Sequence, residues 1–247
     1  RLRLVNAPEE EISILLGFES LREALRVVEV VKKDLYDVQA CEIFFRNGLS
    51  LVCDQFGLTP PWSTPSNVYL LVDAAGQSGL VDRISQSPLA GFLESSKYVA
   101  FGSDAVSRKR IWRYRELHTE AISATGVPHK LDVTIPHGRL ADFYDNIEAV
   151  VRSIDNDAQL FLFGHAGDGN IHVNILGPEP EDLTVDKVVL EFVASIGGSI
   201  SAEHGIGRAK ASYLHFNRTD SEIELFRRVK VAFDPAGILN PGAIFNK

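Results

Sequence analysis

The stretch AQLFLFGHAGDGNIHVNIL, at positions 158–176, decides the class of fold. Its two ends, Ala158 to Phe163 and Ile171 to Leu176, are apolar runs of strand length, and the turn between them is rich in glycine. Two strands joined by so short a turn run antiparallel, because parallel neighbours need a long crossover connection. We therefore expect a hairpin here, within an antiparallel sheet.

The rest of the chain alternates between apolar periods of two and of 3.6 residues, so strands and helices are interleaved. Pro88 should kink or split the helix that contains it. We expect strands at 40–45, 67–74, 129–135, 158–163 and 171–176, and helices at 21–35, 81–94, 105–125, 140–154, 186–196 and 221–233.

Adjacent hairpins mixed with helices favour an α+β fold, with an antiparallel sheet covered by helices on one face, over a doubly wound parallel sheet. The order of elements in the second half resembles that in the first, so a duplication of ferredoxin-like halves is an open alternative. We treat 1–247 as one domain that ends in a helical tail, 221–247.

Composition excludes several classes of partner. With 45% hydrophobic residues the chain is typical of a globular protein, and its net charge of −8 argues against binding to nucleic acid or anionic membranes. No apolar run approaches the roughly 20 residues of a membrane span. Cys41 and Cys53 are too few for a disulfide framework, so a reducing compartment is expected.

The chain contains no methionine, and Arg1 to Val5 has the pattern of a strand end. These features indicate a domain taken from a longer protein. Substituted or missing methionines are the alternative explanation.

Three side chains suit a divalent metal. His172 and Asn174 project from the same face of their strand, where a core would have aliphatic residues, and the glycine-rich turn can bring His165 beside His172. Imidazole and carboxylate are ligands that zinc prefers, and iron or manganese would fit them less specifically. His165, His172 and Glu203 are therefore candidate ligands. The alternative is that the histidines only brace a tight turn.

His204 follows Glu203 directly and cannot easily share the same metal geometry. A histidine near a divalent cation stays unprotonated at neutral pH, so His204 is a candidate general base. An equal alternative is a supporting hydrogen-bond donor.

Arg115 and Thr119 are one turn apart in the expected helix 105–125, and Lys130 is the second residue of the next expected strand. A guanidinium binds a carboxylate through two hydrogen bonds, and a hydroxyl one turn away can add a third. From the residues alone, however, such cations are more often solvated surface.

Three motifs carry a family resemblance. GHAGDGNIH at 164–172, SAEHGIG at 201–207 and DPAGILNPG at 234–242 together resemble the C-terminal domain of the FAD-linked oxidases that act on D-2-hydroxy acids. That group includes D-lactate dehydrogenase, D-2-hydroxyglutarate dehydrogenase and the flavin subunit of glycolate oxidase. The likeness covers essentially the whole chain and implies an N-terminal FAD-binding domain of the vanillyl-alcohol-oxidase type, which this sequence lacks.

The resemblance also implies roles for individual residues. The carboxylate of the substrate would be bound as in the 2-hydroxyglutarate enzymes, and the divalent metal, which we expect to be zinc, would bind the substrate oxygens and lower the pKa of the hydroxyl. The base would then take that proton, and a hydride would pass to flavin N5. The matching positions are His165, His172 and Glu203 for the metal, His204 for the base, Arg115, Thr119, Lys130 and Asn174 for the substrate, and Asn240 for the cofactor.

The partners implied are a small 2-hydroxy acid and an electron-transfer protein or iron–sulfur subunit, in the cytoplasm or, in a eukaryote, the mitochondrion. A homodimer is left open. Two rival functions remain at this point: a noncatalytic assembly domain that docks an electron-transfer partner, and a metal-dependent hydrolase that uses a zinc-bound water.

Overall fold

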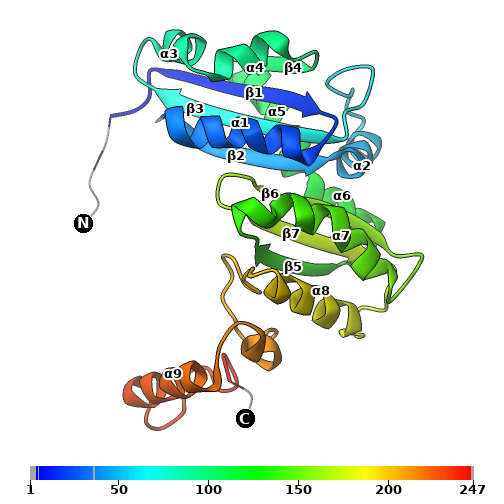
Figure 1. Ribbon diagram of the computed structural model, residues 1–247, viewed down its shortest axis with the longest axis vertical. Coiled ribbons are helices and arrows are strands. Elements are labelled where there is room, and N and C mark those ends of the chain that lie inside the picture. The colour runs from blue at the N-terminus through cyan, green and yellow to red at the C-terminus, as the bar shows by residue number, and fades with distance from the viewer. Residues whose placement is uncertain (1–3, 5, 36, 246–247) are drawn as a thin grey trace. The chain divides into compact units, whose positions relative to one another are not determined.

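The structure is a computed structural model that describes residues 4, 6–35 and 37–245 (Figure 1). The chain divides into two compact units, which are described one at a time. Unit 1 consists of 1–127 and 161–168, and unit 2 of 128–160 and 169–247. Apart from Leu4, which belongs to no strand, the strand end expected at the N-terminus lies outside the described residues.

Unit 1 is built on antiparallel strands in the order β4-β1-β3-β2-β6. Its succession of β1, α1, β2, β3, a helical segment and β4 is that of a ferredoxin-like fold, with α2 inserted after β2. The elements are β1 (Glu10–Phe18), α1 (Leu21–Asp34), β2 (Val38–Phe45), α2 (Arg46–Phe56), β3 (Val68–Gly76), α3 (Leu80–Gln86), α4 (Leu89–Ser95), β4 (Val99–Gly102), α5 (Ala105–Glu116), α6 (His118–Thr125) and β6 (Gln159–His165).

The core of unit 1 lies around its central strands. The residues from Ile12 to Gly17 of β1 are all buried, as are all but one residue of β3, so these strands contain continuous buried runs rather than an alternation. Helix α1 begins at a capping box in which Ser20 accepts from the backbone N–H of Glu23. It then buries one apolar stripe, including Leu21, Val28 and Val31.

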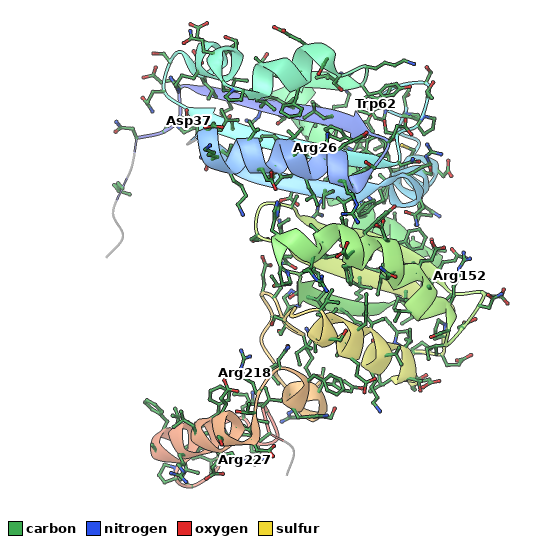
Figure 2. All side chains as sticks on the ribbon, viewed as in Figure 1. Arg26, Asp37, Trp62, Arg152, Arg218 and Arg227 are labelled. Carbon is green, nitrogen blue, oxygen red and sulfur yellow. The ribbon has the colours of Figure 1, made fainter. Side chains whose placement is uncertain are left out.

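The proline-rich segment 57–66 is held down by aromatic stacking. Trp62, labelled in Figure 2, stacks on Tyr69 of β3 and on Tyr98, with ring centroids 5.5 and 5.4 Å apart. Its indole N–H donates to Ser66 Oγ at 3.2 Å. A side chain at Gly17 would collide with both Trp62 and Ser66, so glycine is required there.

Unit 2 repeats part of that succession. Strands β5 and β7 pair antiparallel from His129 opposite Ile175 to Thr134 opposite Asn170, and Thr134 also bridges Ser199. Its elements are β5 (His129–Thr134), a 3-10 turn η1 (His137–Arg139), α7 (Leu140–Arg152), β7 (Asn170–Leu176), α8 (Thr184–Ser195), a 3-10 segment η2 (Ala211–Phe216) and α9 (Asp220–Phe233).

Along the chain, β5-α7-β6-β7-α8 has the same order as β1-α1-β2-β3-α3 if the inserted helix α2 is left out, which agrees with the suggested relation between the halves. The α+β class with an antiparallel sheet and helices is confirmed. The split of the second expected helix at Pro88 is also confirmed, because α3 ends before it and α4 begins after it.

Other expectations were wrong. The single helix expected over 105–125 is two helices, α5 and α6, which meet at Leu117. Strands β1 and β4 and helix α2 were missed altogether.

The two cysteines are free and buried. Within the described residues, no helix is long and apolar enough to cross a membrane.

Candidate active site

In unit 1, a group that we call the Glu42 cluster joins Glu42, Arg115 and His165. Glu42 lies on β2 directly opposite His165 on β6, so the two side chains share one face of the sheet. Oε1 of Glu42 lies 2.6 Å from Nδ1 of His165, and Oε2 lies 2.8 Å from Nε of Arg115. Glu42 is 4% exposed, so one buried carboxylate faces two basic side chains.

Arg115 is held on two sides. Its Nε faces Glu42, and its guanidinium carbon lies 4.6 Å from the ring centroid of Phe163. Burial lowers the pKa of Arg115, although the charge of Glu42 opposes that shift. Because Nε is engaged by Glu42, the terminal nitrogens form the edge that can bind another carboxylate.

His118 begins α6 beside this cluster and is fully buried. Its Nδ1 lies 3.1 Å from the carbonyl oxygen of Arg115, and its ring packs against those of Phe44 and Phe163. Burial, assisted by the nearby charge of Arg115, lowers the pKa of His118 to about 3, so the ring is neutral in the folded protein. This histidine was not a candidate in the sequence, and its role is to support the core.

Thr119 does not share the setting of Arg115. It is exposed, whereas Arg115 is 9% exposed, because the chain passes from α5 to α6 between them. The expectation that both residues lie on one face of a single helix is therefore wrong. The predicted contact between Thr119 and substrate stays a prediction.

In unit 2, polar residues line one face of the β5–β7 pair. Lys130 is opposite Asn174 and Asp132 is opposite His172. Lys130 is exposed, whereas Asn174 is 3% exposed and its Nδ2 has no hydrogen-bond partner among the described residues. A buried amide donor of this kind is available to a bound ligand.

Asp132 organises this face and was missed in the sequence. Its Oδ2 accepts from the backbone N–H groups of Glu203 at 2.8 Å and His204 at 3.4 Å, and its Oδ1 lies 3.4 Å from Nδ1 of His172. Burial acts to raise the pKa of Asp132, but the N–H of Glu203 and the nearby charges of His172, His204 and Lys210 outweigh it and hold the pKa below its usual value.

The side chains of Glu203 and His204 are exposed while their backbone is fixed on Asp132. Ser201 Oγ donates a hydrogen bond to the carbonyl oxygen of Gly205 at 2.7 Å, which joins the two ends of the 201–205 turn. Gly205 adopts a left-handed backbone with φ of 70°, which explains the glycine after the Glu-His pair.

The predicted metal ligands come from both units, His165 from unit 1 and His172 and Glu203 from unit 2. In the part of the chain that the structure describes, no group of three or more His, Cys, Asp or Glu residues is arranged to hold a metal. His165 and His172 nevertheless each share one feature with histidines that bind metals in proteins, since Nδ1 of the ring faces a carboxylate. The ligand set stays a prediction.

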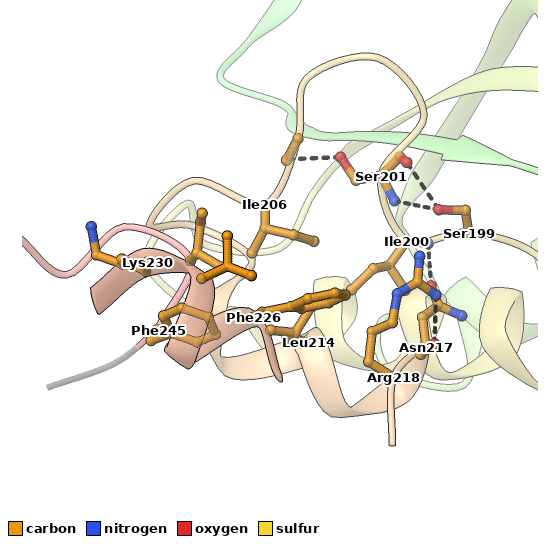
Figure 3. Close-up of a pocket in the computed structure, with 13 residues that line it drawn as sticks. Ser199, Ile200, Ser201, Ile206, Leu214, Asn217, Arg218, Phe226, Lys230 and Phe245 are labelled. Atoms are coloured by element: carbon orange, nitrogen blue, oxygen red, sulfur yellow. Dashed lines mark hydrogen bonds between the residues drawn. The ribbon is translucent and has the colours of Figure 1, made fainter. Parts of the chain in front are cut away.

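A pocket of about 580 Å³ lies beside the 199–206 segment, η2 and α9 (Figure 3). Its polar side includes Asn217, which accepts from the N–H of Ile200 at 2.7 Å, and its apolar side includes Leu214 and Phe226. The predicted ligand and substrate residues are not among those that line it.

Asn240 lies in a turn organised by Asp234, whose carboxylate accepts from the N–H groups of Ile238 and Leu239 at 2.9 and 2.8 Å. Asn240 is exposed with φ of 46°. Its predicted cofactor contact is untested.

A match over residues 7–244 identifies the family as the C-terminal domain of FAD linked oxidases. The chain belongs to this family. A D-2-hydroxyglutarate dehydrogenase of Stutzerimonas stutzeri is 34% identical over 99% of the chain and 54% of its own length. A mitochondrial D-2-hydroxyglutarate dehydrogenase of Arabidopsis thaliana is 30% identical over 93% of the chain and 42% of its own length.

This FAD-linked oxidase domain thus spans about half the length of the curated relatives that it matches. Its fold is similar to that of 4-ethylphenol oxidase from Gulosibacter chungangensis, with a TM-score of 0.69 and 17% identity over 100% of the chain and 56% of the oxidase. The family resemblance inferred from the three motifs is confirmed.

Proposed function

We propose that this chain is the substrate-binding domain of an FAD-dependent dehydrogenase that oxidises a D-2-hydroxy acid to the 2-oxo acid, with D-2-hydroxyglutarate as the favoured substrate. The observation that carries the proposal is the similarity, over nearly the whole chain, to proteins named D-2-hydroxyglutarate dehydrogenase. The Glu42 cluster supports it, since it presents an arginine edge suited to a carboxylate.

The substrate would be recognised through its charges. Hydroxyglutarate carries two carboxylates, and the candidate residues include two cations, Arg115 and Lys130. Asn174, on the same face as Lys130, would donate its buried amide to a substrate oxygen. Thr119 would add a hydroxyl contact. Lactate has only one carboxylate and would leave one cation unused.

The chemistry would be divided among the predicted groups. A divalent metal held by His165, His172 and Glu203 would lower the pKa of the substrate hydroxyl, and FAD would accept the hydride. His204, whose backbone N–H is bound to Asp132, would take the hydroxyl proton as general base. Asn240 would contact the cofactor.

The test is turnover by the full-length protein, with its flavin region, across a panel of D- and L-2-hydroxy acids. We expect the highest kcat/KM for D-2-hydroxyglutarate, with lower values for D-lactate and glycolate. Glu203→Ala should lose turnover in parallel with its bound metal. Normal turnover by Glu203→Ala after chelator treatment would show that the metal role is wrong.

A further inference from the structure

Asp132 holds the turn that contains Glu203 and His204 against the edge of β5. Its backbone carbonyl oxygen accepts from the N–H of Ala202 at 3.3 Å, and its Oδ2 accepts from the N–H groups of Glu203 at 2.8 Å and His204 at 3.4 Å. Consecutive backbone N–H groups that point at one oxygen form an anion-binding concavity, and here the anion is a side chain of the same unit. The course of the 202–204 backbone therefore depends on Asp132.

Lys210 reaches the same residue from the far end of the segment. Its Nζ donates to the carbonyl oxygen of Asp132 at 2.9 Å, so that one oxygen accepts from both Ala202 and Lys210. Between the two contacts the chain folds back, because the backbone N–H of Lys210 donates to the carbonyl oxygen of Ile206 at 3.2 Å. Both ends of the 202–210 segment are thus fixed on one residue of β5.

The charges of Lys210 and Asp132 also support each other. Lys210 is half-buried, and burial lowers its pKa while the charge of Asp132 opposes that shift. Burial acts to raise the pKa of Asp132, and the charge of Lys210 is among the effects that keep this pKa low. An ionised carboxylate only accepts hydrogen bonds, which is what the N–H groups of the turn require. Lys210 therefore helps to keep Asp132 in the form that binds the turn.

We propose that Lys210 is a positioning residue that acts through Asp132 to hold the turn that carries His204, the proposed general base. The inference rests on the proposed function. The side chain of His204 is exposed, so its location depends on the backbone that carries it more than on packing. Lys210 lies outside the motif SAEHGIG at 201–207, and the sequence did not suggest a role for it.

The rival role for Lys210 is a direct contact with substrate. An ammonium group has three N–H donors, and among the described residues only one donor of Lys210 has a partner. Steady-state kinetics separate the two roles. Loss of a substrate contact raises KM, whereas a displaced base lowers kcat and leaves KM nearly unchanged.

The first experiment compares lysine variants of the full-length holoenzyme with D-2-hydroxyglutarate as substrate. Lys210→Met keeps the length of the side chain and removes the donor, and it should lower kcat about 10- to 100-fold while KM changes by less than about twofold. Lys210→Arg should retain most of kcat, because a guanidinium can still donate to the carbonyl oxygen of Asp132.

Lys187→Met is the matched control, because it makes the same substitution at an exposed position of α8, where Lys187 lies 3.8 Å from Glu191. Its kcat and KM should equal those of the unaltered protein. Unchanged kcat in Lys210→Met would overturn the inference, and so would a rise in KM at unchanged kcat.

Amide hydrogen exchange of the same proteins tests the turn without relying on turnover. In the unaltered holoenzyme the amides of 202–204 should be protected, although the side chains of Glu203 and His204 are exposed. Lys210→Met should speed exchange at 202–204 about tenfold and leave β7 unchanged, because local opening requires the loss of only the contacts at Asp132. Exchange at 202–204 that is the same in Lys210→Met and Lys187→Met would contradict the role of Lys210.

The unaltered protein keeps the inference testable even if Lys210→Met does not fold, since unprotected amides at 202–204 would overturn it. The two proposals also fail in different ways. If the unaltered holoenzyme oxidises no D-2-hydroxy acid, the proposed function fails, and the exchange data still decide whether Lys210 holds the turn. Normal turnover by a folded Lys210→Met variant leaves the proposed function intact and removes only this inference.

Discussion

Arg115 uses different parts of its side chain for different neighbours, Nε for Glu42 and the planar face for Phe163. A lysine at this position has one ammonium group and cannot hold Glu42 while presenting a planar edge to substrate. We predict that Arg115→Lys raises KM for D-2-hydroxyglutarate about 10- to 100-fold, the range expected for hydrogen bonds to a charged group.

The control for that variant is Arg113→Lys, two positions earlier on α5, whose side chain lines a separate pocket with Arg110 and Tyr114. Steady-state kinetics should show an unchanged KM for the control. An equal rise in KM for both variants would mean that Arg115 acts only through the stability of α5.

His118 should make folding depend on pH. Burial lowers its pKa to about 3, below the ordinary histidine value of about 6.5 in the unfolded chain. Between these two pKa values the unfolded state binds more protons than the folded state. The stabilisation of the folded state by neutral His118 is therefore fully present above the unfolded pKa and is lost as the pH falls. From pH 7 to pH 5 the loss is about 2 kcal/mol.

His118→Asn keeps a hydrogen-bonding group but does not titrate. We predict that the variant is less stable than the unaltered protein at pH 7, and that this difference shrinks by about 2 kcal/mol at pH 5. Urea denaturation at the two pH values measures both numbers. A difference that stays constant with pH would show that His118 is not buried in its neutral form.

Among single residues, the sequence identified as site candidates the polar residues that lie within otherwise apolar strands. His172 and Asn174 stood out because polar residues alternate with Ile171, Val173 and Ile175 where a core is expected. Asp132 did not stand out, because a lone acid in a strand usually faces water. Its burial depends on the 203–204 backbone about 70 positions later, which no local pattern reports.

At the scale of elements, the glycine-rich turn between β6 and β7 contains two glycines with different requirements. Gly169 has φ of 77°, and a β-carbon there would collide with the carbonyl oxygen of Ile135. A β-carbon at Gly167 would lie 3.7 Å from that of Cys41, an ordinary contact. We predict that Gly169→Ala costs more than about 1–2 kcal/mol, since a clash adds to backbone strain.

Gly167→Ala serves as the matched control and should change the free energy of unfolding by no more than about 0.5 kcal/mol. Thermal unfolding of the two variants measures the contrast. Equal melting temperatures would contradict the turn geometry described here.

The misassigned helix shows what local patterns omit. Positions 105–125 contain neither glycine nor proline, so propensity favours one continuous helix. The structure interrupts it at Leu117, where His118 enters the core between the rings of Phe44 and Phe163. Strand β1 was missed for a related reason, because the residues from Ile12 to Gly17 are all buried, which removes the alternation that marks a strand.

At the scale of the whole molecule, the antiparallel α+β class followed from the element order, and the family followed from three motifs that lie far apart in the sequence. Neither the element order nor the motifs identify the substrate. The motifs contain the residues of the proposed reaction, whereas the choice among 2-hydroxy acids depends on the shape of the pocket around the substrate side chain. The relatives are about twice the length of this chain, so a flavin reaction is a property to test in the full-length protein.

The central claim is that this domain presents a D-2-hydroxy acid to a flavin. The most direct measurement is anaerobic bleaching of the flavin absorbance of the full-length protein in a single turnover. D-2-hydroxyglutarate should bleach the flavin with one equivalent of 2-oxoglutarate formed, and the L-enantiomer should not. Failure of every D-2-hydroxy acid in the panel to bleach the flavin would contradict the account.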